Sequence, residues 1–281
     1  MNLRYTWHLL KQNPLTIVGM IIVFLIFVGA LLGPWIIPYP DDVKGKVTIA
    51  NRFIPPNSQH WFGTDEMGRD IFSRVVYGAR TSVIIGLVVT GIAMLIGIPL
   101  GAVAGYRGGK VEAVINVITN IFMAIPALLL ALSISVALGR GIINAMLAVG
   151  IAWWPYYARL VRGVVLSLKE QTFVEAARSI NAKDSRIILK HILPNCVDVI
   201  IVQVTAQFGY AILMAAALGF LGVGAQPPMA EWGLMISTGR LFIPKWWWIP
   251  TFPGIAIYIS VFGFSVLGDG LRDILDPRLR K

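Results

Sequence analysis

The sequence predicts an all-α membrane protein with six transmembrane helices. Of its 281 residues, 57% are hydrophobic and only 14% are charged, and the mean hydropathy is +0.74. Long apolar stretches without a charged residue also recur along the chain. A soluble fold could hardly bury that much apolar surface, whereas a bilayer solvates it directly. The formal net charge of +10 does not indicate nucleic-acid binding, because membrane proteins hold excess Lys and Arg on their cytoplasmic side.

Six uncharged runs mark the expected spans. Each holds about 18 or more residues, roughly the length needed to cross the hydrocarbon core. The first is longer than the core of a typical signal peptide, so we interpret it as a retained anchor. The fourth is the shortest, but it ends in Trp and Tyr residues that suit a membrane interface. The runs cover residues 12–40, 81–106, 113–139, 141–158, 199–230 and 246–268.

The distribution of basic residues predicts the orientation. With the N-terminus inside, the cytoplasmic segments hold most of the 24 Lys and Arg residues, and the loop after the fourth run is the richest in them. This bias favours an N-in/C-in topology. The basic residues assigned to the inside are Arg4, Lys11, Arg107, Lys110, Arg159, Arg162, Lys169, Arg178, Lys183, Arg186, Lys190, Arg272, Arg278, Arg280 and Lys281.

Small residues and prolines shape the expected spans. Gly97, Gly101 and Gly105 recur every four residues in the second run, which places bare patches on one helix face and lets another helix approach closely. Prolines inside three of the runs are expected to kink their helices. These prolines are Pro99, Pro126 and Pro155.

The external loop at 41–78 is expected to contain a separate amphipathic helix. After a turn at 62–70, Phe72 and Val75 fall on one side of the next segment, which suggests a helix lying in the membrane interface. Asp70 and Arg74 are spaced for an i,i+4 ion pair, and we expect that pair to lie on the surface.

The loop at 159–195 is typical of a helix–turn–helix. Thr172 and Glu175 have the spacing of a capping box, in which each side chain bonds a free backbone amide of the first turn. Asn181 is expected to end this helix in the left-handed conformation. Asp184 is expected to cap a second helix, which should stop before Pro194.

Small side chains follow the expected cap, at Ala176 and Ala177, and would permit close contact with a partner. We therefore interpret the loop as a docking element. His191 is interpreted as a polar residue at a helix end, because no second ligand has metal-binding spacing.

The loop resembles the EAA motif of binding-protein-dependent ABC importer permeases. That motif has Glu-Ala-Ala, a Gly four residues after the second Ala, and a later Leu-Pro. Asn181 stands where the family has Gly, and it keeps access to the left-handed conformation. The matching residues are Glu175, Ala176, Ala177, Leu193 and Pro194.

Further segments narrow the resemblance to the dipeptide/oligopeptide/nickel branch, and within it to the C-type subunit with an extra N-terminal span. The similarity covers nearly the whole chain from about residue 10. Ala230 departs from the Pro that relatives often have. The segments are 60–70, 77–82, 219–228, 231–233 and 267–277.

The resemblance implies a type I ABC importer (MetI-like) permease fold in the cell inner (plasma) membrane, multi-pass. It implies a docking loop for an ATPase subunit, whereas no catalytic, cofactor-binding, metal or substrate-binding residue is assigned. The partners implied are a second homologous permease subunit, two cytoplasmic ABC ATPase subunits and an extracytoplasmic substrate-binding protein. The docking residues are Thr172, Glu175, Ala176, Ala177, Arg178, Asn181, Asp184, His191, Leu193 and Pro194.

The expected organisation has three parts. Residues 1–76 form a cytoplasmic tail, the first transmembrane helix and a periplasmic loop with the interfacial helix. Residues 77–272 form a five-helix permease core that contains the 159–195 coupling loop, and residues 273–281 form a cytoplasmic tail. The chain lacks the phosphate-loop motif, which is GxxxxGK followed by Ser or Thr. ATP and Mg²⁺ are therefore expected on the partner ATPases.

Three alternatives stay open from the residues alone. The cargo of the importer is expected to be a dipeptide or oligopeptide, but nickel or a metal chelate would pass through the same kind of subunit. An ion-coupled secondary transporter would normally need carboxylates inside the spans, and the centres of the six runs lack ionisable residues. An enzyme would need a convergent catalytic set, and the three histidines are scattered over different faces of the membrane.

Overall fold

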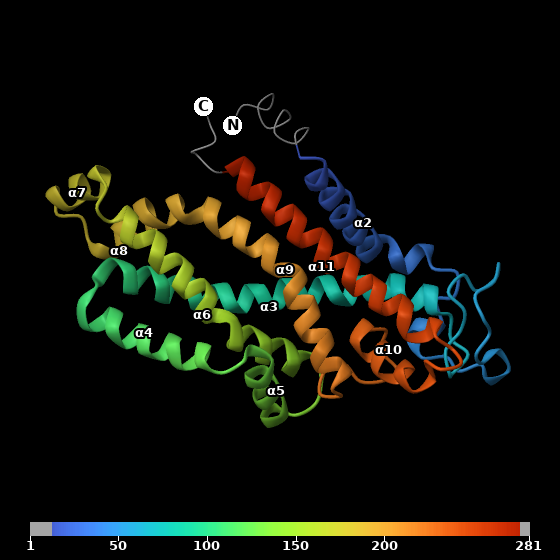
Figure 1. Ribbon diagram of the computed structural model, residues 1–281. Helices are drawn as coiled ribbons and strands as arrows, with labels where there is room; N and C mark the ends of the chain where they lie inside the picture. The colour runs from blue at the N-terminus through green and yellow to red at the C-terminus, as the bar shows by residue number, and fades with distance from the viewer. Residues whose placement is uncertain (1–12, 276–281) are drawn as a thin grey trace.

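The computed structural model describes residues 13–275, and every regular element in that range is helical (Figure 1). The basic residues Arg4, Lys11, Arg278, Arg280 and Lys281, which were used to orient the chain, lie outside the described residues. The helices are α2 (Pro14–Ile36), α3 (Ile71–Arg107), α4 (Gly109–Ala124), α5 (Ala127–Leu138), α6 (Ile142–Leu168), α7 (Thr172–Ser179), α8 (Asp184–Ile187), α9 (Val197–Phe220), α10 (Trp232–Gly239) and α11 (Trp248–Leu275).

Four described helices are long and apolar enough to cross a membrane. They are α2, α3, α11 and the continuous helix Asp184–Phe220, whose last part is α9. The bent pair α4 and α5 makes a fifth if it counts as one span. Helix α6 has 27 residues but is not among these helices. The sixth span therefore stays a prediction.

Proline breaks the third predicted run and leaves two others continuous. Helices α4 and α5 meet at an angle of 91° on either side of Pro126. Ile125, directly before this proline, is extended, because the proline ring disfavours helical geometry in the residue that precedes it. By contrast, α3 runs through Pro99 and α6 through Pro155.

Helices α3 and α6 pack along the glycine face predicted from the sequence. A Cβ atom added at Gly97 would lie 2.5 Å from the backbone oxygen of Trp154, and one at Gly105 would lie 2.8 Å from Val165 Cβ. At Gly101 the added atom would overlap the Ala158 carbonyl. Because no side chain separates the helices there, their backbones come into direct contact.

The loop at 41–78 does not contain the separate interfacial helix expected before residue 77. Residues 71–76 instead form the first turns of α3, which continues without a break to Arg107. This expectation is wrong because Asp70 caps α3: its carboxylate accepts a hydrogen bond from Ser73 N at 2.7 Å. The expected border between residues 76 and 77 therefore falls inside a helix.

The fifth predicted run also ends earlier than residue 230. Helix α9 stops at Phe220, and Gly222 follows with a φ of +82°. The chain then turns through residues 221–231 into the short helix α10. Positive φ costs glycine little, so this turn ends the helix where composition alone indicates a continuing span.

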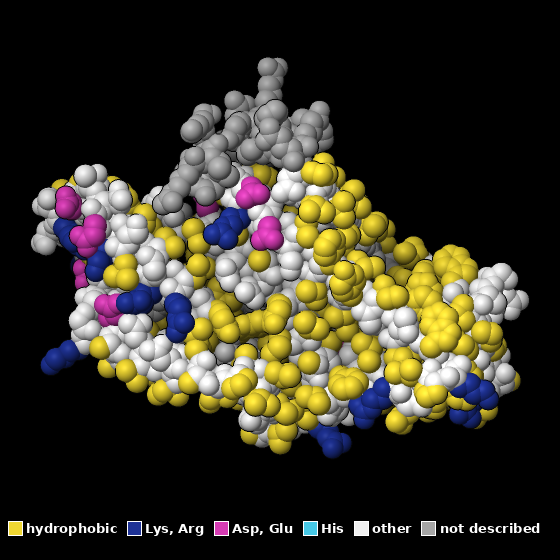
Figure 2. Space-filling model, in the orientation of Figure 1, with side chains coloured by type: hydrophobic (Ala, Val, Ile, Leu, Met, Phe, Trp, Pro, Cys, Tyr) yellow, Lys and Arg dark blue, Asp and Glu magenta, His cyan; other side chains and the backbone are white. Residues whose placement is uncertain are grey.

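Hydrophobic side chains cover the middle of the molecule, and charged side chains gather at its ends. In Figure 2 the Lys, Arg, Asp and Glu side chains cluster around the end that carries α7 and α8. Further basic side chains lie at the opposite end, near α10 and the loop at 41–78. A wide apolar band with polar ends is the surface expected of a membrane-embedded protein.

Candidate functional site: the loop between α6 and α9

Helices α7 and α8 form a compact hairpin at one end of the molecule (Figure 1). Asn181 lies in the turn with a φ of +58°, which confirms the predicted left-handed residue. The turn is closed by two backbone hydrogen bonds, from Asn181 N to Arg178 O at 2.8 Å and from Ala182 N to Ala177 O at 3.1 Å. The second bond supplies a partner for a carbonyl that the end of α7 would leave free.

The predicted capping box is wrong. Helix α7 begins at Thr172 itself, with Gln171 at the N-cap and no side-chain capping bond. Val174 in the first turn is completely buried. We infer that burial of this residue sets where the helix starts, since tertiary packing overrides a local capping preference. The carboxylate of Glu175 is left on the exposed face.

One face of the hairpin is anchored in the protein and the other is exposed. Val174, Ala177 and Ile187 are buried in a cluster with side chains from the ends of α3 and α6. Ala177 therefore packs inward, and only Ala176 of the two alanines is open to a partner. The predicted docking residues that lie on the exposed surface are Thr172, Glu175, Ala176, Arg178, Asn181, Asp184 and Pro194, whereas His191 and Leu193 are half-buried.

Two large apolar side chains on the exposed face were not predicted. Ile180, next to Asn181 at the tip of the hairpin, is 80% exposed, and Phe173 is 37% exposed. The sequence signal was their position: Ile180 stands beside the turn residue Asn181, and Phe173 stands beside Thr172 at the expected helix start. Together with Ala176 they give the charged tip an apolar centre, which is the composition of a protein-binding surface.

Tyr106, at the end of α3, holds the hairpin and was also missed. Its hydroxyl donates to Asp184 Oδ1 at 3.2 Å. The Arg178 guanidinium carbon lies 5.3 Å from the centre of the Tyr106 ring, and hydrogen bonding to Tyr106 raises the pKa of Arg178. Tyr106 thus contacts α7 and α8 from a membrane-spanning helix, an arrangement that sequence spacing could not reveal.

Asp184 is not the expected N-cap. Lys183 occupies that position, and Asp184 is the first residue of α8. Its carboxylate accepts from Tyr106 instead. A negative charge in the first turn still favours the helix through the helix dipole.

The second helix does not stop before Pro194. A π-helical turn at Ile188–Ile192 and a 3-10 turn at Leu193–Cys196 join α8 directly to α9. The prediction is wrong because the wider π turn accommodates a residue without an N–H. Asn195 Nδ2 donates to the backbone oxygen of His191 at 2.6 Å, which satisfies a carbonyl near the disturbed turn.

The opposite end of the molecule carries a buried polar network rather than a surface ion pair. Asp70 and Arg74 are both buried, and their predicted pairing is wrong because each side chain binds elsewhere. Asp70 Oδ1 lies 2.9 Å from His60 Nδ1. Arg74 donates to the backbone oxygens of Asp42, Pro228 and Met229 at 3.1–3.2 Å. Arg74 thereby ties the loop at 41–78 to the turn after α9.

Within residues 13–275, no group of three or more His, Cys, Asp or Glu side chains is placed to hold a metal ion.

Comparison with known families gives two matches. Residues 97–281 match the family described as binding-protein-dependent transport system inner membrane component. Residues 2–56 match the N-terminal TM domain of oligopeptide transport permease C. The first match alone covers most of the chain.

Curated relatives are similar over nearly their whole length. The dipeptide transport system permease protein DppC of Alkalihalophilus pseudofirmus is 46% identical over 99% of this chain and 90% of the relative. The probable D,D-dipeptide transport system permease protein DdpC of Escherichia coli K12 is 43% identical over 96% and 90%. The oligopeptide transport system permease protein OppC of Bacillus subtilis is 41% identical over 96% and 88%.

A solved structure shares the fold. An inward-facing conformation of the MetNI methionine ABC transporter superposes with a TM-score of 0.59 at 21% identity. The alignment covers 72% of this chain and 96% of that one. At this identity the likeness concerns the fold, and it confirms the predicted MetI-like architecture.

Proposed function

Since this chain belongs to the family of binding-protein-dependent transport system inner membrane components, we propose that it is the permease subunit of an ATP-driven importer of short peptides. The curated relatives described above are named for dipeptides or oligopeptides, which supports a peptide cargo over nickel or a metal chelate. The observation that carries the proposal is the α7–α8 hairpin, anchored on one face and exposed on the other.

In this proposal the exposed face of the hairpin docks on a cytoplasmic ABC ATPase. Ala176 and Ile180 supply the apolar centre of the contact, and Glu175 and Arg178 supply charges around it. The buried face passes motion to α3 and α6, because Val174 and Ile187 pack without free space against those helices. ATP and Mg²⁺ bind to the ATPases, and this chain supplies no catalytic residue.

The assembly that follows has two permeases, this chain and a homologous subunit, with two ATPases inside and a substrate-binding protein outside. The chain crosses the inner membrane six times, N-in and C-in. Helix α6 is the fourth span, and the bent pair α4 and α5 is the third. The division is an N-terminal extension (1–76), a core (77–272) and a tail (273–281), with its first border inside α3.

The docking assignment is tested with Glu175→Lys in the complete complex. The exposed position lets the variant fold and insert, and the reversed charge is expected to reduce copurification of the ATPase and peptide transport. Glu170→Lys is the matched control, because Glu170 is an exposed carboxylate of the same loop outside the motif. Normal copurification and normal transport by Glu175→Lys would contradict the assignment.

A further inference from the structure

A groove at the hairpin end of the molecule lies outside the proposed ATPase contact. It has a volume of about 440 Å³ and lies between α6, α9 and α11. We call it the α9 groove, since half of its lining residues come from the start of that helix. Its polar lining residues are Asn195, Asp198, Gln203 and Arg272, and its apolar walls include Leu160 and Val202.

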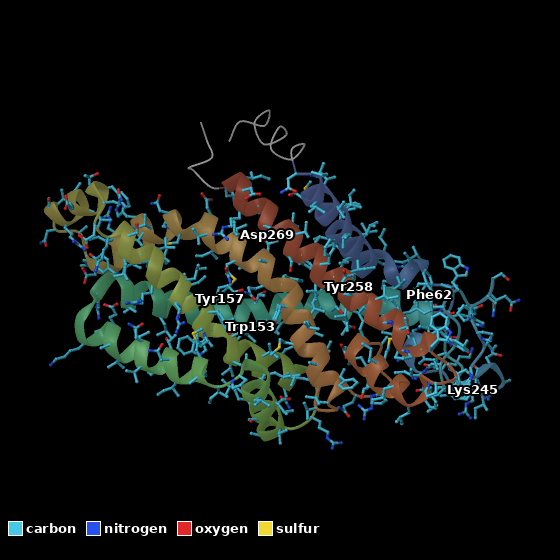
Figure 3. The ribbon with its side chains drawn as sticks, viewed as in Figure 1. Phe62, Trp153, Tyr157, Lys245, Tyr258 and Asp269 are labelled. Atoms are coloured by element: carbon cyan, nitrogen blue, oxygen red, sulfur yellow. The ribbon has the colours of Figure 1, made fainter. Side chains whose placement is uncertain are left out.

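The groove lies at the end of the spans that faces the docking hairpin. Asp198 is the second residue of α9, just after the 3-10 turn Leu193–Cys196. On α11, Asp269 lies near the same end of the molecule (Figure 3), and Arg272 is about one turn further along. With the hairpin on the cytoplasmic side, a solute in this groove would be leaving the membrane.

The α9 face that continues from the groove is not suited to lipid. Gln203 and Gln207 are one turn apart and half-buried, and neither side chain hydrogen bonds to another residue within 13–275. A primary amide in hydrocarbon needs a hydrogen-bond partner. This face of α9 is therefore better suited to water or a polar solute than to lipid, and it continues the polar lining of the groove.

The mouth of the groove carries one charge of each sign. In the part of the chain that the structure describes, no ion pair joins Asp198 to Arg272, and both side chains are exposed. A free anion would be repelled by Asp198 and a free cation by Arg272. A molecule with an ammonium at one end and a carboxylate at the other satisfies both side chains.

We propose that the α9 groove binds a short zwitterionic peptide on its way out, with Asp198 facing the ammonium and Arg272 facing the carboxylate. Gln203 and the side-chain oxygen of Asn195 are available for the peptide amide, and Leu160 and Val202 contact side chains. The volume falls within the range of small-molecule sites, about 300–1,000 Å³. This inference rests on the peptide-importer function proposed above.

The test uses the complete transporter in nucleotide-free membranes, without the binding protein, so that only the permease path can select. A dipeptide with a photoreactive side chain is crosslinked and the labelled residues are mapped by mass spectrometry. Competition is measured with an unmodified dipeptide and with its N-acetylated and C-amidated forms. We expect labelling in the groove, and competition by the unmodified dipeptide about tenfold stronger than by either blocked form.

Each charge has its own variant and its own matched control. Asp198→Asn is expected to remove the advantage over the N-acetylated form alone, and Arg272→Gln the advantage over the C-amidated form alone. Asp273→Asn controls for the first, because Asp273 accepts instead from Asn13 Nδ2 at 3.5 Å. Arg107→Gln, an exposed arginine at the end of α3, controls for the second.

Labelling outside the groove, or equal competition by all three dipeptides, would overturn the proposed site. ATP-driven uptake is measured in parallel with the binding protein present. Normal uptake together with either of those results rejects only the groove. Absence of peptide uptake by the wild-type complex rejects the proposed function and the groove with it.

Discussion

The contact between Tyr106 and the α7–α8 hairpin leads to the most specific prediction. Tyr106→Phe removes the hydroxyl, which donates to Asp184 Oδ1 at 3.2 Å and also hydrogen bonds with Arg178. The ring remains, so its buried contacts and the cation–π contact with Arg178 are kept. A hydrogen bond to a charged group contributes about 1.5–3 kcal/mol. Because Asp184 is exposed, we discount this to about 1 kcal/mol.

A loss of that size acts on local opening of the hairpin rather than on the whole fold. It corresponds to an about fivefold larger open population around the start of α8. Amide hydrogen exchange on the reconstituted complex is therefore expected to be about fivefold faster at residues 182–187 and unchanged in the spans. Fewer peptides should be transported for each ATP hydrolysed, because the loosened hairpin transmits less of the ATPase motion.

Tyr210→Phe is the matched control, since this tyrosine is 50% exposed and its hydroxyl bonds to no residue within 13–275. The reasoning is refuted if exchange at 182–187 is the same in Tyr106→Phe and wild type. It is also refuted if exchange rises uniformly through the protein, because the hydroxyl would then support the whole fold.

Three further predictions concern stability and are measured by thermal unfolding in detergent. Gly101→Ala should lower the free energy of unfolding by about 1–3 kcal/mol, because the added Cβ overlaps the Ala158 carbonyl. Gly91→Ala, in the same helix with open surroundings, should leave it unchanged. Equal melting temperatures of the two variants would disprove the close packing. Arg74→Ala should cost about 3–5 kcal/mol, since it removes the buried ion pair with Asp65 at 3.7 Å and leaves buried backbone acceptors unpaired. A loss below about 1 kcal/mol would show that the network is not structural. Burial raises the pKa of Glu231 to about 7. Between its unfolded value near 4.5 and this raised value, only the folded chain keeps the proton, so the free energy of unfolding falls as pH rises. Glu231→Gln should flatten this pH dependence, and a slope equal to that of the wild type would contradict the raised pKa of Glu231.

The sequence predicted the membrane class and the helix–turn–helix of the 159–195 loop because both depend on local patterns. Hydropathy locates spans without knowledge of their neighbours, and the φ of Asn181 follows from a preference of that residue. The glycine face of α3 was also predictable, because its spacing alone places the bare positions on one side.

The remaining features depend on contacts between distant segments. The capping box failed because burial of Val174 sets the start of α7. The Asp70–Arg74 pair failed because Arg74 binds backbone oxygens that lie 154 and 155 residues further along the chain. Tyr106 was missed for the same reason, since its partner Asp184 is brought to it only by the fold. No periodicity in the chain records such contacts.

The uninterrupted path from α8 through the π turn into α9 has a mechanical consequence. Residues Asp184–Phe220 form one helical element of 37 residues, which corresponds to a path of roughly 55 Å along the helix axis and bends along α9 (Figure 1). If this helical element pivots as a unit by about 5° at its hairpin end, its far end is displaced by up to roughly 5 Å, about one helical turn. A small tilt imposed by a neighbouring subunit would thus displace the far end of this helix by several ångströms at the other membrane surface. The π turn at Ile188–Ile192 is where the helix would bend.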